Sequence, residues 1–460
     1  MPEDREATQP PCPAGLTPWQ GLAAAALLLS IPVLLFWRDF PFYMIDDWTA
    51  LLQMAGRPFW DYLLVPDGDQ WFPFFHLIFY GLVRLAGERY QLLVLVNCLG
   101  TGVNAFLVFL FFRRHLGPGL ALTLSALYAG AAVHHAIAWN SFYLSYLLSL
   151  GFFLGALLLT DAYLRTPGRG RLWGIGCCAL LSVLSHNYSL AGLTALPLYA
   201  LLVRGDSGRK FWALAGTVAV VYLVFTLGYL SFAGPRAAAS QNLQVFAGLP
   251  GPNYLVHLFF GAVLSPFFYL FWGHYHFPVF WGYVGYAYVA GITLLAASLA
   301  AIWCWGKAPQ RRLALWALLT NALPFLLISL TRYQRSLNQA FVARYGIFTL
   351  IGALLLIGTA WRVLAPRLPQ GRRWRLLPLG LLAVMAAGQI LSLPRWTEKY
   401  QGISRAARTC YYELSRQNEA ARLSPEEYGK FCPGSHPVIT PGQALAVRRF
   451  LNRQTPGPDF

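Results

Sequence analysis

Acidic residues are scarce in this chain of 460 residues, which contains 18 Asp and Glu against 35 Lys and Arg. Charged residues of both signs make up only 12% of the sequence, whereas 57% of it is hydrophobic and 16% is aromatic. This composition, with a mean hydropathy of +0.48, excludes an ordinary soluble globular domain. Apolar stretches of about 20 residues recur along the chain, and each is long enough to cross a membrane. We therefore predict an all-α polytopic membrane protein.

Signals for other protein classes are also missing. The first 20 residues lack the basic segment of a secretory signal peptide, so 19–36 is expected to be a retained span. The seven cysteines show no zinc-like spacing. The net charge of +17 is explained by basic loops that stay cytoplasmic. Binding of a nucleic-acid duplex is excluded as the explanation, because the sequence contains no soluble basic domain that could hold one. We expect a membrane partner and no nucleic acid.

Basic residues gather in five short connections between the apolar segments. Placing all five on the cytoplasmic side predicts about eleven spans, with the N-terminus inside and the C-terminus outside. The predicted spans are 19–36, 91–112, 119–138, 143–164, 172–186, 189–203, 211–230, 279–304, 313–330, 345–363 and 376–393. The stretch 73–86 is expected to be an amphipathic helix along the membrane. The stretch 255–272 is expected to lie on the outer face or to re-enter, because counting it as a span would place later basic residues outside.

This topology divides the chain into two regions. Residues 1–393 would form the transmembrane domain, whose first outer loop, 37–90, carries the pair Asp46-Asp47. Residues 394–460 are polar and are expected to form a small exoplasmic C-terminal region. Cys410 and Cys432 would both face an oxidising compartment there, so they are candidates for a disulfide, with two free thiols as the alternative.

The acidic residues of the first outer loop are candidates for a functional site. Adjacent carboxylates beside a bilayer are costly, because like charges repel and lipid does not solvate them. Asp46, Asp47 and Asp69 are therefore predicted to form a carboxylate site, either for general-base catalysis or for a divalent cation such as Mg or Mn. The alternative for the pair is the start of an amphipathic helix from Trp48 onward. One acid suffices to begin a helix, and this position has two adjacent acids, which favours a functional role for the pair.

Basic and imidazole side chains are predicted on the same outer face. Arg332, Arg335 and Arg344 lie there against the topological preference. Because the guanidinium fork matches phosphate oxygens, they are candidate phosphate ligands, with Arg344 first. Contact with anionic lipid headgroups is the alternative. His186 and His135 are candidates for substrate contact, against the alternative of ordinary polar anchoring at the interface.

Several strings of the sequence resemble the GT-C glycosyltransferases, which include protein O-mannosyltransferases, the aminoarabinose transferase of lipid A and the oligosaccharyltransferase catalytic subunit. The strings are Asp46-Asp47 after the first span, DGDQWFPFF at 67–75, VHHAIAWN at 133–140 and Ala343-Arg344-Tyr345. The resemblance covers residues 20–365. The chain departs from the pattern at 185–188, where many members carry Lys-Glu or Lys-Gly, and no tetratricopeptide array follows.

The resemblance implies a GT-C-like bundle with exoplasmic juxtamembrane helices. It also implies an inverting transfer of sugar from a polyprenyl-phosphate donor to a protein, lipid or glycan acceptor on the exoplasmic face. Asp46 matches the first acid of the family pair and would be the base, while Asp47 would orient the acceptor, assist, or bind a metal; which acid takes the proton stays open. The expected location is a bacterial inner membrane, with the site facing the periplasm.

Other functions of polytopic membrane proteins remain as alternatives. They are a secondary transporter or flippase of lipid-linked sugars, and an O-antigen polymerase or ligase. Transporters place acids within their spans, whereas the acids of this chain avoid them, with Asp161 at a cytoplasmic end as the clearest exception. This distribution favours the glycosyltransferase.

Overall fold

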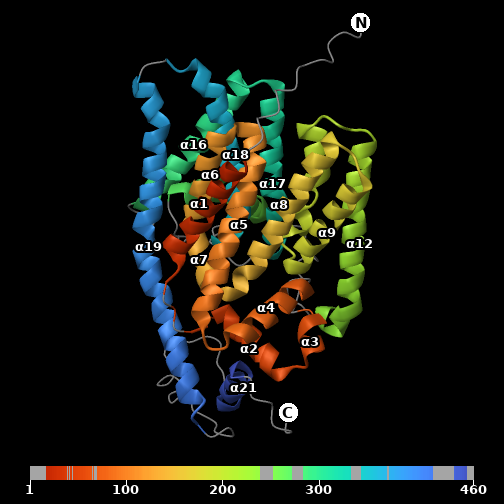
Figure 1. Cartoon of the computed structure of the whole chain (residues 1–460), viewed down its shortest axis with the longest axis vertical. Helices are drawn as coiled ribbons and strands as arrows, with labels where there is room; N and C mark the ends of the chain where they lie inside the picture. The colour runs from red at the N-terminus through yellow and green to blue at the C-terminus, as the bar shows by residue number, and fades with distance from the viewer. Residues whose placement is uncertain are drawn as a thin grey trace.

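The computed structural model describes residues 17–38, 40, 42–43, 45–64, 66, 70–238, 252–271, 283–332, 343–369, 372–417, 432 and 440–452. Every regular element in these ranges is a helix (Figure 1). The first thirteen elements along the chain are α1 (Pro18–Phe36), α2 (Ile45–Gly56), α3 (Phe59–Leu64), α4 (Pro73–Ala86), α5 (Tyr90–Leu116), α6 (Pro118–Gly130), α7 (Val133–Trp139), η1 (Ser141–Tyr143), α8 (Leu144–Arg165), α9 (Arg169–Ser185), α10 (Ser189–Gly192), α11 (Ala195–Leu198) and η2 (Tyr199–Val203). The others are α12 (Arg209–Ala238), α14 (Pro252–Phe259), η4 (Phe260–Leu264), α15 (Ser265–Phe271), α16 (Tyr283–Trp305), α17 (Ala308–Arg332), α18 (Ala343–Leu364), η7 (Ala365–Arg367), α19 (Arg372–Leu414) and α21 (Pro441–Leu451).

The long helices form a bundle of membrane-spanning character, as the composition predicts. Eight helices in the described ranges are long and apolar enough to cross a membrane, and nine if the pair α6 and α7, bent by 55°, counts as one span. In α18, 78% of the most apolar stretch is buried inside the bundle, so α18 is its central helix. In α1 and α12 only 22% of the corresponding stretch is buried, so most of their side chains are available to contact lipid. The predicted all-α membrane fold is confirmed.

The predicted count of eleven spans is not confirmed. Helix α9 has only 17 residues, and the predicted span 189–203 is divided among α10, α11 and the π-helix η2. Within the 43-residue helix α19, the described apolar stretch is Gly380–Leu391. Hydropathy reports how apolar a stretch is, but helix ends and changes of helix type depend on the packing around it.

The stretch Asn253–Phe271 is also long and apolar enough to cross a membrane, whereas the sequence predicts that it lies on the outer face or re-enters. One end of this stretch contacts α17 near its C-terminal end, and the other contacts α18 near its N-terminal end. His257 Nδ1 lies 2.9 Å from Ser329 Oγ, three residues before α17 ends, and the Tyr269 ring packs against Gly346, three residues after α18 begins. The α16–α17 and α18–α19 connections lie at the upper end of the bundle in Figure 1. Both contacts are therefore toward the lower ends of α17 and α18, and the placement of 255–272 on the outer face or as a re-entrant segment stays a prediction.

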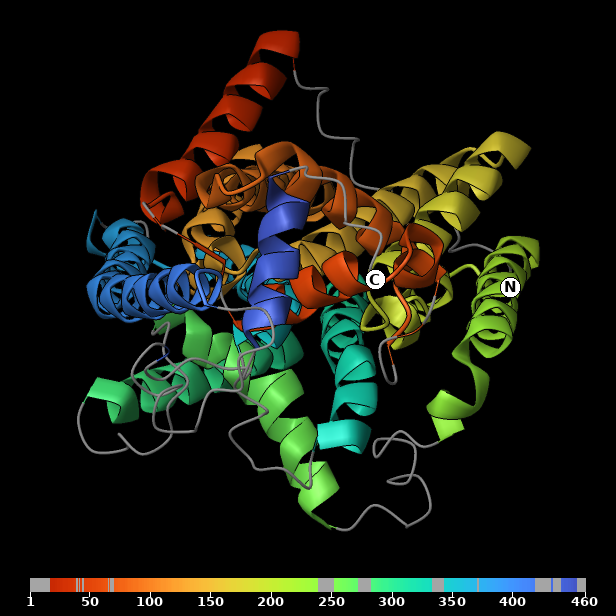
Figure 2. The same cartoon turned by 90° about the horizontal axis from the view of Figure 1, so that it is seen from below.

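The first loop and the C-terminal region meet at this lower end (Figure 1). Helices α2, α3 and α4 gather there, and Figure 2 shows α21 lying across them. The Tyr411 and Tyr412 hydroxyls donate to the Glu88 carboxylate at 3.2 and 2.7 Å, and Arg84 Nη1 donates to the Phe450 carbonyl at 2.8 Å. The C-terminal region therefore covers the first loop.

Helix α19 passes through residues 393 and 394 without a break, so the polar C-terminal region begins inside a helix. Its far end is held by a disulfide between Cys410 and Cys432, which confirms the predicted pair. This bond ties the end of α19 to the chain that precedes α21.

Candidate active site

Asp47 is completely buried and holds the first loop against the bundle. It is the third residue of α2, and its Oδ2 accepts a hydrogen bond from the Tyr90 hydroxyl at 2.7 Å. Its Oδ1 accepts from the Ser141 hydroxyl at 2.8 Å and from the Phe142 backbone N–H at 2.7 Å. A carboxylate that accepts several hydrogen bonds is held in one orientation, so Asp47 positions α2 against α5 and η1.

The short helix η1 links this carboxylate to a candidate phosphate ligand. Asn140 caps η1, because its side chain accepts from the Phe142 N–H at 3.2 Å, and Asp47 accepts from the same donor. One residue later, the Tyr143 hydroxyl accepts from Arg344 Nη1 at 2.5 Å. The Arg344 guanidinium lies 5.4 Å from the Tyr143 ring centre, a distance typical of a cation–π contact. Asp47 and Arg344 are thus bound to adjacent parts of one three-residue element.

His186 belongs to the same neighbourhood. It follows α9, and its ring centre lies 3.9 Å from that of Tyr146 in α8 and 5.2 Å from that of Phe72, which is stacked on it from the first loop. Its Nδ1 accepts from the Tyr188 N–H at 3.0 Å, so that nitrogen carries no proton. The Tyr188 hydroxyl in turn donates to the carbonyl of Tyr345, the residue after Arg344, at 3.2 Å.

Aromatic rings shield the acid from water. The Tyr43 ring lies 4.8 Å from the Tyr90 ring, and the Tyr43 hydroxyl donates to the Gly87 carbonyl at 2.6 Å. Burial raises the pKa of Tyr43, and the charges of Asp47 and Glu88 raise it further. Tyr43 therefore stays protonated and acts as a hydrogen-bond donor at any physiological pH.

The structure brings together only some of the predicted site residues. Asp47, Arg344 and His186 converge on η1 and Tyr146, whereas His135 in α7 packs against Trp139 and against Tyr400 of α19. Asp46 precedes Asp47 in the first turn of α2, and Arg332 is the last residue of α17. The structure does not describe the side chain of either residue. Asp69 and Arg335 lie outside the described residues.

No group of three or more metal-ligating side chains occurs among the described residues. The predicted metal ligands are Asp46, Asp47 and Asp69, and of these only Asp47 has a described side chain. Both of its carboxylate oxygens already accept hydrogen bonds. Asp47 is therefore poorly suited to be a metal ligand, and a divalent cation stays an expectation for the other two acids.

Sequence reasoning missed the residues that connect the site. Tyr90 and Ser141 hold Asp47, Tyr143 holds Arg344, and Tyr146 packs against His186. Ser141 directly follows the string at 133–140 that resembles the glycosyltransferases, which is the one local signal that could have drawn attention to it. Tyr90 carries no such signal.

The fold is similar to those of two solved transferases, whereas no protein-family model and no curated protein matches the sequence. The crystal structure of ArnT from Cupriavidus metallidurans in the apo state is similar with a TM-score of 0.54 at 14% identity, covering 90% of this chain and 84% of that one. The Archaeoglobus fulgidus oligosaccharyltransferase, tethered with an acceptor peptide, is similar with a TM-score of 0.53 at 15% identity, covering 95% of this chain and 64% of that one. At such identities the likeness shows the fold alone, and it confirms the resemblance drawn from the sequence at that level.

Proposed function

We propose that this chain transfers a sugar from a polyprenyl-phosphate donor to a protein, lipid or glycan acceptor at the end of the bundle where α2 lies. The observation that carries the proposal is the joint anchoring of Asp47 and Arg344 on η1. An inverting transfer needs a carboxylate near the acceptor and a cation near the departing phosphate, and this element holds one of each. The proposed location is a bacterial inner membrane, with this end facing the periplasm.

We propose Asp46 as the base and Asp47 as a positioning residue. Asp47 is buried and accepts hydrogen bonds on both oxygens, so it is a poor proton acceptor for an incoming substrate. Asp46, the preceding residue of α2, would take the proton of the acceptor hydroxyl. The acceptor oxygen would then form a bond to the anomeric carbon while the bond between that carbon and the phosphate oxygen breaks.

Arg344 is the proposed ligand of the leaving phosphate. Its position at the second residue of α18 places it at the end of a helix, and the rings of Tyr143 and Tyr345 lie 5.4 and 5.3 Å from its guanidinium. Aromatic faces and the Tyr143 hydroxyl hold the guanidinium plane in place. A pre-oriented cation stabilises the negative charge that develops on the phosphate in the transition state. His186, whose proton is on Nε2 when it is neutral, is a candidate donor to the sugar or the phosphate.

The proposal is tested by substituting Asp46 and a matched acid of the same loop. The wild type, Asp46→Asn and Asp61→Asn are assayed for sugar release from a panel of radiolabelled polyprenyl-phosphate sugars, with a membrane extract as the acceptor source. Asp61 is exposed in α3, so its substitution controls for the loss of a negative charge in the first loop. Loss of a general base lowers the rate by about 10²–10⁴-fold, and we expect that loss for Asp46→Asn only.

Two outcomes contradict the proposal. Equal turnover by Asp46→Asn and the wild type removes Asp46 as the base. Absence of turnover with every donor, together with uptake of a lipid-linked sugar into proteoliposomes, supports the transporter instead. Arg344→Gln serves as the second variant, with an expected loss of about 10²-fold from the missing phosphate contact.

A further inference from the structure

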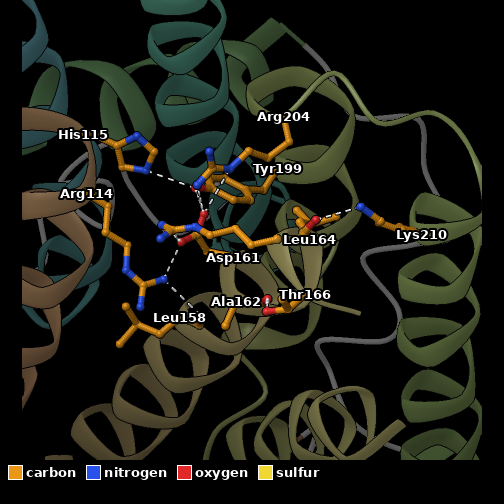
Figure 3. Close-up of polar contacts among 11 residues, drawn as sticks. Arg114, His115, Leu158, Asp161, Ala162, Leu164, Thr166, Tyr199, Arg204 and Lys210 are labelled. Atoms are coloured by element: carbon orange, nitrogen blue, oxygen red, sulfur yellow. Dashed lines mark hydrogen bonds and ion pairs between the residues drawn. The ribbon is translucent and has the colours of Figure 1, made fainter. Parts of the chain in front are cut away.

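A second buried carboxylate lies at the opposite end of the bundle. Asp161 is one turn from the end of α8 and is completely buried. It pairs with Arg114 of α5 at 2.5 Å, with Arg165 of its own helix at 2.5 Å, and with Arg204, the residue that follows η2. It also accepts from the Tyr199 hydroxyl at 2.8 Å. Figure 3 shows the side chains of Arg114, Tyr199 and Arg204 converging on Asp161 from three segments of the chain.

The cations around Asp161 outnumber it. Three guanidinium groups against one carboxylate leave two positive charges uncompensated within this cluster of Arg114, Asp161, Arg165 and Arg204, hereafter the arginine cluster. The nearest acid along the chain, Asp206, is paired with Lys210 at 3.7 Å. Closely spaced like charges repel, so the cluster is costly as a purely internal ion pair and favours an additional anion.

Donor groups remain available in the cluster. Arg114 donates to Asp161 and to the Leu158 carbonyl through Nη1 alone, and Arg204 donates through Nε and Nη2. Arg114 Nε and Nη2 therefore have no hydrogen-bond partner among the described residues. The Arg114 and Arg204 side chains are 25% and 31% exposed, so an anion can reach them from outside. The guanidinium fork is suited to bidentate contact with phosphate oxygens.

Exposed tryptophans at this end of the bundle indicate that the arginine cluster lies at the level of the lipid headgroups. Three tryptophans lie at the same end and are 74%, 69% and 50% exposed: Trp173 near the start of α9, Trp212 near the start of α12 and Trp305 at the end of α16. Tryptophan rings of this kind favour the headgroup level of a bilayer. Asp161 and Arg114 are within one turn of the ends of α8 and α5, which places the guanidinium groups at about that level.

We propose that the arginine cluster binds the phosphate monoester headgroup of a membrane lipid. A phosphate monoester carries a charge of about −1.5 to −2 at pH 7, which matches the two uncompensated positive charges. A phosphodiester headgroup carries one charge and offers fewer free oxygens, so it binds more weakly. This site is at the other end of the bundle from α2 and is independent of the proposed sugar transfer.

The test measures lipid binding by the purified full-length chain in a neutral detergent. Native mass spectrometry and thermal unfolding are followed with added dioleoylphosphatidic acid, a monoester, and with dioleoylphosphatidylglycerol, a diester. Inorganic phosphate is the third ligand and separates a lipid from a free anion. We expect phosphatidic acid to bind most tightly and to raise the melting temperature in proportion to its occupancy.

Variants give effects of opposite sign. Arg204→Gln should weaken phosphatidic acid binding by about tenfold or more, because a charge-assisted contact is lost. Asp161→Asn should strengthen it several-fold, because the competing negative charge disappears while an acceptor oxygen stays. Arg169→Gln is the control, since Arg169 is an exposed cation at the same end that lies outside the cluster. A purely structural cluster would not give opposite changes in affinity.

Three results would overturn the proposal. They are equal affinity of Arg204→Gln and Arg169→Gln, unchanged or weaker binding by folded Asp161→Asn, and inorganic phosphate binding as tightly as the lipid. If Asp161→Asn does not fold, Arg114→Lys replaces it. Lysine keeps the charge without the fork, so it should bind phosphatidic acid more weakly than the wild type and more tightly than Arg114→Gln.

Discussion

The two buried aspartates, Asp47 and Asp161, lie at opposite ends of the bundle and are held in different ways. Asp47 accepts hydrogen bonds from the buried hydroxyls of Tyr90 and Ser141 and from a backbone N–H. Asp161 is surrounded by arginines whose side chains are 25–41% exposed. One carboxylate is held by short neutral groups inside the protein, and the other by long cations that reach water.

This difference separates a positioning acid from an anchoring ion pair. Neutral donors orient a carboxylate without cancelling its charge, so the field of Asp47 stays in the site where substrate chemistry is proposed. Arginines cancel the charge of Asp161 and leave a positive surplus that is partly exposed. The end with Asp47 is suited to chemistry on a bound substrate, and the end with Asp161 to orientation in the membrane and anion binding.

The largest expected effect compares Asp47→Ala with Asp161→Ala. Removing Asp47 takes this acceptor from three buried donors, of which the Tyr90 hydroxyl keeps only the Trp139 carbonyl and the Phe142 N–H only the Asn140 side chain. Hydrogen bonds to charged groups contribute about 1.5–3 kcal/mol each, so we expect a loss of about 4 kcal/mol in the free energy of unfolding. Removing Asp161 leaves arginines that can turn to water, so we expect about 2 kcal/mol. Reversible unfolding in mixed detergent micelles, followed by tryptophan fluorescence, measures both. An Asp161→Ala cost equal to or above that of Asp47→Ala would contradict the distinction.

A smaller effect compares the same substitution at the two ends, Tyr90→Phe and Tyr199→Phe. Each removes one hydroxyl that donates to a buried aspartate, at 2.7 and 2.8 Å. We expect about 2 kcal/mol for Tyr90→Phe, because hydrogen bonds to charged groups contribute about 1.5–3 kcal/mol. Tyr199→Phe should cost less than about 1 kcal/mol, since three arginines remain on Asp161.

Tyr128→Phe is the control for this pair. Tyr128 is completely buried, and its hydroxyl has no hydrogen-bond partner among the described residues. Its substitution should be neutral or slightly stabilising, because a buried hydroxyl without a partner is unfavourable. Equal losses for all three variants would mean that the ring environment, and not the carboxylate contact, sets the stability.

The comparison also shows what the sequence could predict. Apolar stretches and basic loops predicted the helical membrane fold, and the position of Asp47 after the first span singled it out as functional. Its partners could not be predicted, because Tyr90 and Ser141 are 43 and 94 residues away and no local pattern links them. In the sequence, the arginines around Asp161 indicate only the topology of the chain. Their convergence on one carboxylate depends on how α5, α8 and η2 pack.

The smallest expected effect concerns His76, a buried imidazole of α4 at the same end as Asp47. Burial is the main reason that the pKa of His76 is lowered to about 4. Between that value and the unfolded value of about 6.5, the unfolded chain binds more protons, so stability falls as the pH falls below 6.5. The loss from pH 7 to pH 5.5 should be about 1.2 kcal/mol for this residue.

His76→Phe removes the titration while keeping a ring stacked on Tyr62, whose centre lies 4.7 Å from that of His76. We expect the variant to lose less stability than the wild type over this pH interval, with the difference concentrated in α3 and α4. Hydrogen exchange of the amides in these helices at pH 7 and pH 5.5, corrected for the intrinsic rates, locates the effect. The same pH dependence in both proteins would show that acid acts on groups other than His76. A change confined to the first loop would show that this end loosens in acid independently of the arginine cluster.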